Sequence, residues 1–204
     1  MKKTKKEFEI YRPHPWHGIE IGDNSPKIVN AYIEICPIDG VKYEIDKKTG
    51  YLKVDRPQLT SSLPPALYGF IPRTYSAENV AKLSNTARIG DGDPIDICVL
   101  SERPITKSEI IVPARVIGGL RLIDKGEADD KIIAVLESDP YWSEVSDIKE
   151  LSKIYLSRII HYFLTYKLKP GEASKIKIEN EYGANDAYKV IKAGQSDYKA
   201  HYET

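Results

Sequence analysis

The sequence has no net charge and no long apolar run. Its 204 residues contain 30 Lys and Arg against 30 Asp and Glu, so the formal charge is zero. Proteins that bind nucleic acid through its phosphates usually carry a cationic excess, which is missing here. No apolar stretch approaches the roughly 18 residues that a membrane-spanning helix requires. We therefore expect neither nucleic acid nor a membrane as a partner.

Cysteine is also scarce, and two cysteines cannot build a disulfide framework. Cys36 and Cys98 each stand beside apolar, strand-like residues, which predicts buried free thiols. Free thiols are typical of reducing compartments, so a cytoplasmic protein is expected. The basic run at residues 1–6 is followed by charged residues and not by an apolar segment, so we do not interpret it as an export signal.

The first two-thirds of the chain contains the β-branched and aromatic runs of a strand-rich fold. Strands are expected at 28–36, 41–46, 51–55, 95–100, 110–122 and 131–136. Residues 47–50 form the turn of a hairpin between the second and third of these. Gly118 and Gly119 predict a bend in the longest strand, and the segment 62–72, rich in Pro and Gly, predicts a loop.

The later part of the chain changes to a helical period. Apolar residues spaced by three or four over 148–166 predict an amphipathic helix. Asp147 and Glu150 have the spacing of a capping box at its start, and Pro170 with Gly171 marks its end. Two further elements are expected, an exposed strand at 175–179 and a helix at 183–202. Strands followed by helices predict a single α+β domain with a mostly antiparallel sheet or small barrel.

An N-terminal arm is expected at about residues 1–27. His14 and His17 flank Trp16 there, in a segment that also contains two prolines. Two histidines could bind a metal, but no acid or cysteine stands beside them, so a structural arm is the preferred interpretation. His161 falls within the predicted helix 148–166, and we expect it to serve in packing or at an interface.

The most informative segment holds three carboxylates within six residues. Asp91, Asp93 and Asp96 directly precede an apolar strand. In a regular strand Asp91 and Asp93 would share a face and Asp96 would point away, but Gly92 and Pro94 allow a bend that brings all three together. Such carboxylates repel one another unless cations neutralise them. A hard divalent cation with oxygen ligands fits, and Mg²⁺ is the most available.

Two plainer interpretations fit this segment less well. A solvated acidic turn is common, but it seldom leads straight into a buried strand. A calcium loop of the EF-hand type would place Asp91, Asp93 and Glu102 at loop positions 1, 3 and 12. Ile95 and Asp96 then break the pattern, and the flanking residues are strand-like and not helical.

A second acidic cluster covers residues 124–131, in a turn between two apolar strands. Taken alone, it is typical of a charged hairpin loop. Next to the first cluster it could add ligands to the same metal site, with Lys131 facing an anion.

Basic and phenolic groups complete the pattern. Tyrosine outnumbers phenylalanine by fourteen to three, so some tyrosines are expected to line a polar cavity. The candidates to hold phosphate oxygens are Lys42, Arg56, Tyr68, Tyr166 and Lys167. The sequence has no Walker loop, no dinucleotide-binding loop and no paired-cysteine zinc motif, and nothing marks a Ser-His-Asp triad.

On these motifs the sequence resembles the soluble family I inorganic pyrophosphatases of the bacterial type. The segment 91–99 matches that family's signature. The resemblance also covers 32–35, 42–46, 54–56, 68–72, 124–131 and 161–167. Their order and spacing agree over residues 30–168. Pro64 and Leu67 differ from residues that are common in the family.

The resemblance implies a fold, an activity and partners. The fold would be a five-stranded OB-like β-barrel flanked by two C-terminal helices. The activity would be Mg²⁺-dependent hydrolysis of inorganic pyrophosphate to two phosphates, by direct attack of a metal-activated water, with three to four Mg²⁺ per site. A homo-oligomer, typically a hexamer, is also implied.

The resemblance further implies a role for each matching residue. Asp93 would be the general base. The metal ligands would be Asp91, Asp96, Asp124 and Asp129, with Glu34 and Glu44 acting mainly through water. The residues that bind phosphate oxygens would be Lys42, Arg56, Tyr68, Lys131, Tyr166 and Lys167, and Tyr68, Lys42 and Arg56 would also be catalytic.

Two other functions remain open at this point. One is an OB-like binding module whose acids hold structural Ca²⁺, but the sequence lacks a basic stripe or an aromatic platform for single strands. The other is a metal-dependent phosphohydrolase that acts on nucleotides, for which no base-stacking motif is evident.

Overall fold

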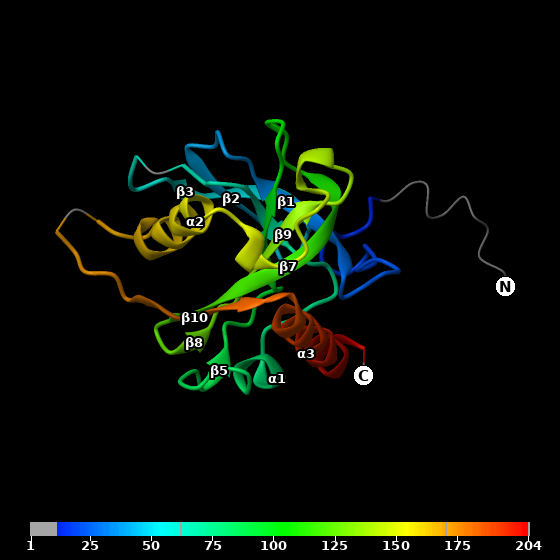
Figure 1. Ribbon diagram of the computed structural model, residues 1–204. Coiled ribbons are helices and arrows are strands. Elements are labelled where there is room, and N and C mark those ends of the chain that lie inside the picture. Colours follow the sequence, from blue (N-terminus) through cyan, green and yellow to red (C-terminus); the bar gives the residue numbers. More distant parts are fainter. Residues whose placement is uncertain (1–11, 62, 170, 204) are drawn as a thin grey trace, which may run out of the picture.

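The centre of the molecule is a closed ring of five strands (Figure 1). This computed structural model describes residues 12–61, 63–169 and 171–203. In ring order the strands are β1 (Ile28–Ile35), β4 (Leu67–Phe70), β6 (Asp96–Leu100), β9 (Lys131–Leu136) and β7 (Ile110–Asp124). β7 pairs with β1 and closes the ring, and only the β6–β9 neighbours in it are parallel. The prediction of an α+β fold with a five-stranded barrel is confirmed.

Strand β4 corrects the prediction of a continuous loop over 62–72. Gly69 allows the two strands to approach closely, because a Cβ at this position would lie 1.8 Å from the carbonyl oxygen of Tyr32. The short strand pairs with β1 on one side and β6 on the other. Its partners are distant in the sequence, and the prolines on both sides of it are typical of a loop, so a local pattern does not predict this strand.

The predicted hairpin forms a separate two-stranded sheet beside the barrel. It consists of β2 (Val41–Ile45) and β3 (Leu52–Pro57), with Lys42 opposite Arg56. Gly50 closes the turn with φ +74°, in the left-handed region that favours glycine. The hairpin therefore places two of the candidate basic residues side by side.

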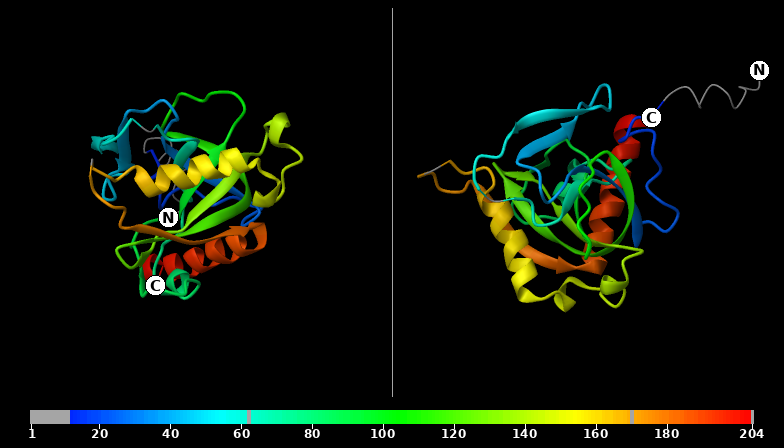
Figure 2. Two further views of the ribbon diagram at one scale, coloured as in Figure 1. Left: turned by 60° about the vertical axis from the view of Figure 1, so that its left-hand side comes forward. Right: turned by 90° about the horizontal axis from the view of Figure 1, so that it is seen from above.

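Two faces of the barrel strands are covered by different helices (Figure 2). Helix α2 (Lys153–Thr165) buries Ile159 and Phe163 in the cluster that contains Cys98 and Leu100 of β6. Helix α3 (Ala184–Tyr202) packs into the cluster that contains the alternate residues of β6, Ile97 and Val99. Strand β10 (Ile176–Gly183) pairs with the second half of β7 and leads into α3.

The start of α2 differs from the prediction. Asp147 and Glu150 do form a capping box, but it caps a single 3₁₀ turn, Ile148–Glu150. Leu151 is extended, with φ −68° and ψ 143°, so the α-helix begins only at Lys153. The buried side chains of Ile148 and Leu151 pack in the same core cluster as α2, which explains why their spacing is helix-like.

Several short elements were not predicted. They are α1 (Glu78–Ala81), β5 (Ile89–Gly90), β8 (Glu127–Ala128) and a second 3₁₀ turn at Pro140–Trp142. The first depends on α3: the buried Asp197 carboxylate accepts hydrogen bonds from the backbone N–H groups of Ala77, Asn79 and Val80. The Gly194 carbonyl accepts another from the N–H of Tyr75, at 2.9 Å.

Other predictions concern the arm and the cysteines. Residues 1–11 of the expected arm lie outside the described residues. Cys36 and Cys98 are free and buried. In the described part of the chain, no helix has both the length and the apolar character to cross a membrane.

Candidate active site

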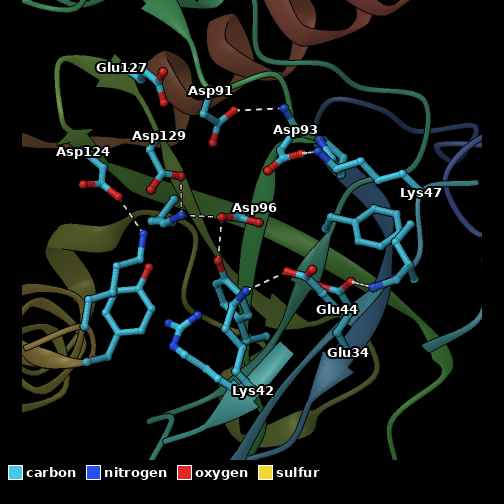
Figure 3. A pocket seen from close by; sticks show the side chains of 18 residues that line it. Glu34, Lys42, Glu44, Lys47, Asp91, Asp93, Asp96, Asp124, Glu127 and Asp129 are labelled. Carbon is cyan, nitrogen blue, oxygen red and sulfur yellow. Dashed lines mark hydrogen bonds and ion pairs between the residues drawn. The ribbon is translucent and has the colours of Figure 1, made fainter. Parts of the chain in front are cut away.

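One cavity, of about 270 Å³, brings together segments that are far apart in the sequence. Every residue that the sequence nominated for metal, substrate or catalysis lines it. These residues are Glu34, Lys42, Glu44, Arg56, Tyr68, Asp91, Asp93, Asp96, Asp124, Asp129, Lys131, Tyr166 and Lys167. Figure 3 shows Asp91, Asp124 and Asp129 on one side of the cavity, with Glu34, Glu44 and Lys42 across from them.

The aspartates of the first cluster converge because the chain bends at Gly92. Its φ of +74° is in the left-handed region, and the Asp93 N–H donates to Oδ1 of Asp91 at 3.1 Å. Ser76 fixes the bend from behind, since its carbonyl accepts from the Gly92 N–H and its N–H donates to the Asp93 carbonyl. The bend therefore directs all three side chains to one cavity, as a regular strand would not.

Lys131 lies between two of the carboxylates. The parallel register of β6 and β9 places it beside Asp96, and its ammonium contacts both Asp96 and Asp129. The lysine is buried, and burial alone would lower its pKa, but the charges of Asp129 and Asp96 outweigh this and raise the pKa well above the usual value. Tyr68 adds a hydrogen bond from its hydroxyl to Oδ2 of Asp96, at 2.5 Å.

The carboxylates themselves are crowded and poorly solvated. Burial raises the pKa of Asp91 well above its usual value, and the neighbouring charges of Asp129 and Asp96 raise it further. Burial also raises the pKa of Asp96, despite the opposing effect of Lys131. A divalent cation would relieve this repulsion, and carboxylate oxygens are the ligands that Mg²⁺ prefers.

The donor set therefore fits Mg²⁺, although the side chains do not form a closed coordination shell. Among residues 12–61, 63–169 and 171–203, no group of three or more His, Cys, Asp or Glu is gathered tightly enough to hold one ion. Asp124 instead accepts a hydrogen bond from Nζ of Lys167 at 2.7 Å. Burial acts to lower the pKa of Lys167, but Tyr166 and the bond to Asp124 raise it above its usual value.

The opposite side of the cavity comes from β1 and the hairpin. Glu34 is buried, its Oε1 accepts the Ile45 N–H at 2.7 Å, and burial raises its pKa to about 8. Lys42 donates to Glu44 at 3.0 Å and to Asp55 at 2.8 Å. Those two acids raise the pKa of Lys42 although its burial acts to lower it. Lys42 is therefore a fixed positive charge at this side.

Two charged cavity residues were not nominated from the sequence. Lys47 lies on the turn between β2 and β3, and Glu127 lies in β8. Lys47 is followed by Lys48, and nothing in that pair of identical side chains tells which one faces a cavity. Glu127 belongs to the second acidic cluster, so its position was within reach of the sequence pattern.

The histidines lie outside this cavity lining. Trp16 is buried and donates from Nε1 to the Thr74 carbonyl at 2.8 Å, and His17 Nδ1 lies 2.8 Å from the Tyr198 hydroxyl. These contacts support a structural arm over a metal site. His161 is exposed on α2, so it does not pack within the chain, and its predicted role at an interface stays a prediction.

Comparison with known proteins identifies the family. A family sequence model described as Inorganic pyrophosphatase matches residues 31–199. The chain belongs to this family. It is 50% identical over 195 residues to the inorganic pyrophosphatase of Chlamydia caviae, covering 91% of this chain and 90% of that protein. It is 39% identical over 185 residues to soluble inorganic pyrophosphatase 1 of Arabidopsis thaliana, covering 91% and 80%.

Solved pyrophosphatases share the fold. The inorganic pyrophosphatase of Thermus thermophilus superposes with a TM-score of 0.77 at 30% identity, over 92% of this chain and 99% of that one. The inorganic pyrophosphatase of Helicobacter pylori gives 0.74 at 34% identity, over 89% and 98%. The resemblance seen in the sequence motifs is therefore confirmed, and the family membership favours an enzyme over a binding module.

Proposed function

We propose that the chain hydrolyses inorganic pyrophosphate to two phosphates, with Mg²⁺ as its cofactor. The observation that carries the proposal is the composition of the cavity described above. Five buried or half-buried aspartates line it, together with lysine, arginine and tyrosine donors. This pairing suits a small, highly charged anion that arrives with divalent cations.

The metal ligands in this proposal are carboxylates. Asp91, Asp96, Asp124 and Asp129 would hold Mg²⁺, and Glu34 and Glu44 would act mainly through water. Bound Mg²⁺ would supply charge neutralisation and lower the pKa of a coordinated water.

The protein's own groups carry the remaining roles. Asp93 accepts a proton from the attacking water. The oxygen of that water bonds to one phosphorus, while the bond from that phosphorus to the bridging oxygen breaks. The bridging oxygen leaves with the second phosphate, so no covalent bond to the enzyme forms. Six side chains hold the phosphate oxygens and absorb the growing negative charge: Lys42, Arg56, Tyr68, Lys131, Tyr166 and Lys167.

The test is phosphate release from pyrophosphate by the purified full chain. We expect turnover with Mg²⁺, very weak turnover after chelation by EDTA, and recovery when Mg²⁺ is added back. Ca²⁺ should inhibit, because it is larger and accepts less regular coordination. ATP is the control substrate. A rate that resists the chelator would contradict the metal-dependent mechanism, and equal turnover of ATP would favour a nucleotide phosphohydrolase instead.

Two further expectations stay predictions. A homo-oligomer, by resemblance a hexamer, can be checked by light scattering of the purified protein. The cytoplasmic location can be checked by cell fractionation.

A further inference from the structure

Lys47 reaches from the hairpin turn to the loop that carries Asp93. Its ammonium forms an ion pair with the Asp93 carboxylate. The same ammonium makes a long hydrogen bond to the Gly92 carbonyl, at 3.5 Å. Figure 3 shows the two side chains meeting at the edge of the cavity. Lys47 thus contacts both the side chain and the backbone of the bent loop.

The turn that carries Lys47 is held by the arm on its other side. Nε2 of His14 lies 3.2 Å from the Lys47 carbonyl oxygen, within hydrogen-bond distance. Gly50 packs directly on the same segment, since a Cβ there would lie 2.6 Å from Cδ of Pro15 and 3.0 Å from Cδ2 of His14. The position of the turn therefore depends on the arm.

Trp16 of the arm is in turn bonded to residues 73–74, which support the aspartate loop, that is, the bent segment 91–96. Trp16 donates to the Thr74 carbonyl and accepts from the Arg73 N–H at 2.9 Å. The Thr74 hydroxyl accepts from the Ile95 N–H, also at 2.9 Å. Arm, turn and aspartate loop form one connected frame, in which Lys47 is the link that crosses the edge of the cavity.

The ion pair is too exposed to contribute much to the free energy of unfolding. The side chains of Lys47 and Asp93 are 56% and 45% exposed, and pairs of this kind contribute little to folding. The pair does fix the direction of the carboxylate. Direction matters for a group that must accept a proton from an attacking water, because small misplacements reduce rates steeply.

We propose that Lys47 is a positioning residue, which holds the Asp93 carboxylate and the Gly92–Asp93 backbone in the orientation needed for proton acceptance. The inference rests on the proposed function, in which Asp93 is the general base. The arm, through His14, sets where Lys47 stands. The segment 13–18 would then contribute to catalysis by positioning Lys47, although it lies far from the metal ligands in the sequence.

The test compares three variants of the full chain. Lys47→Ala should lower kcat for pyrophosphate by roughly 10- to 100-fold and change KM by less than about twofold, because orientation and not binding is lost. Lys47→Arg should restore most of kcat. Lys48→Ala removes the same charge from the same turn, outside the cavity lining, and should leave kcat unchanged.

A second measurement does not depend on turnover. With EDTA present, amide hydrogen exchange in the segment 90–96 should be several-fold faster in Lys47→Ala than in the unsubstituted chain or in Lys48→Ala. An unchanged kcat in Lys47→Ala, unchanged exchange, or a rise in KM at constant kcat would each overturn the positioning role while leaving the proposed function in place. No phosphate release from the unsubstituted chain would overturn both.

Discussion

Replacing Asp93 with asparagine is expected to remove most of the turnover and to leave Mg²⁺ binding largely intact. Asparagine keeps the size of the side chain but cannot accept the proton of the attacking water. General-base catalysis contributes about 10² to 10⁴ in rate, so kcat for pyrophosphate should fall by that factor. The measurements are steady-state phosphate release and Mg²⁺ titration by calorimetry. The four other aspartates of the cavity are unchanged in this variant.

The matched control for this variant is Asp186→Asn. Asp186 is an exposed aspartate that also pairs with a lysine, Lys189, at 2.7 Å, but it lies on α3. Its replacement should leave kcat and Mg²⁺ binding unchanged. Full activity of Asp93→Asn would refute the assignment of the base, and loss of Mg²⁺ binding would identify Asp93 as a metal ligand instead.

Replacing Lys131 with methionine is expected to destabilise the protein and to impair catalysis together. The lysine side chain is 2% exposed and contacts two acids, Asp96 and Asp129. Its removal leaves their charges buried without this partner, which in comparable cases costs about 3 kcal/mol of unfolding free energy. For a domain of this size the melting temperature should fall by roughly 10 °C. Thermal unfolding in EDTA measures the change.

Lys177→Met is the control for Lys131→Met. Lys177 is exposed on β10, so the same chemical change there removes a solvated charge only, and the melting temperature should stay within about 2 °C. If the two variants have the same melting temperature, Lys131 does not stabilise the two acids in the folded protein. If Lys131→Met keeps full kcat, the lysine is not a phosphate ligand.

The fold was predictable where local patterns decide the structure. The apolar runs of β1, β6, β7 and β9 gave strands close to their observed bounds. β4 was missed because its strand character comes from partners on β1 and β6, and Gly69 is needed for that close approach. The start of α2 was misplaced because a capping box reports a local backbone turn, and Leu151 then leaves the helical conformation.

The site was more predictable than the helix boundaries. Carboxylates around Gly92 and the donors on β2, on β3 and directly after α2 were nominated because each type of side chain has a chemical reason to be there, and all of them line the cavity. Lys47 was missed because its importance lies in what it contacts. Its contact with Asp93 and the His14 bond to its turn are tertiary contacts, and no local sequence pattern predicts them.

The buried Asp197 on α3 has a consequence for the order in which the molecule is assembled. Its carboxylate organises residues 77–80, and Ser76 next to them fastens the Gly92 bend. Every residue that lines the cavity precedes α3 along the chain. During synthesis on the ribosome the barrel strands therefore emerge before the helix whose Asp197 supports the segment next to Ser76, and we expect the Gly92 bend to become fully supported only after α3 has been made and has packed.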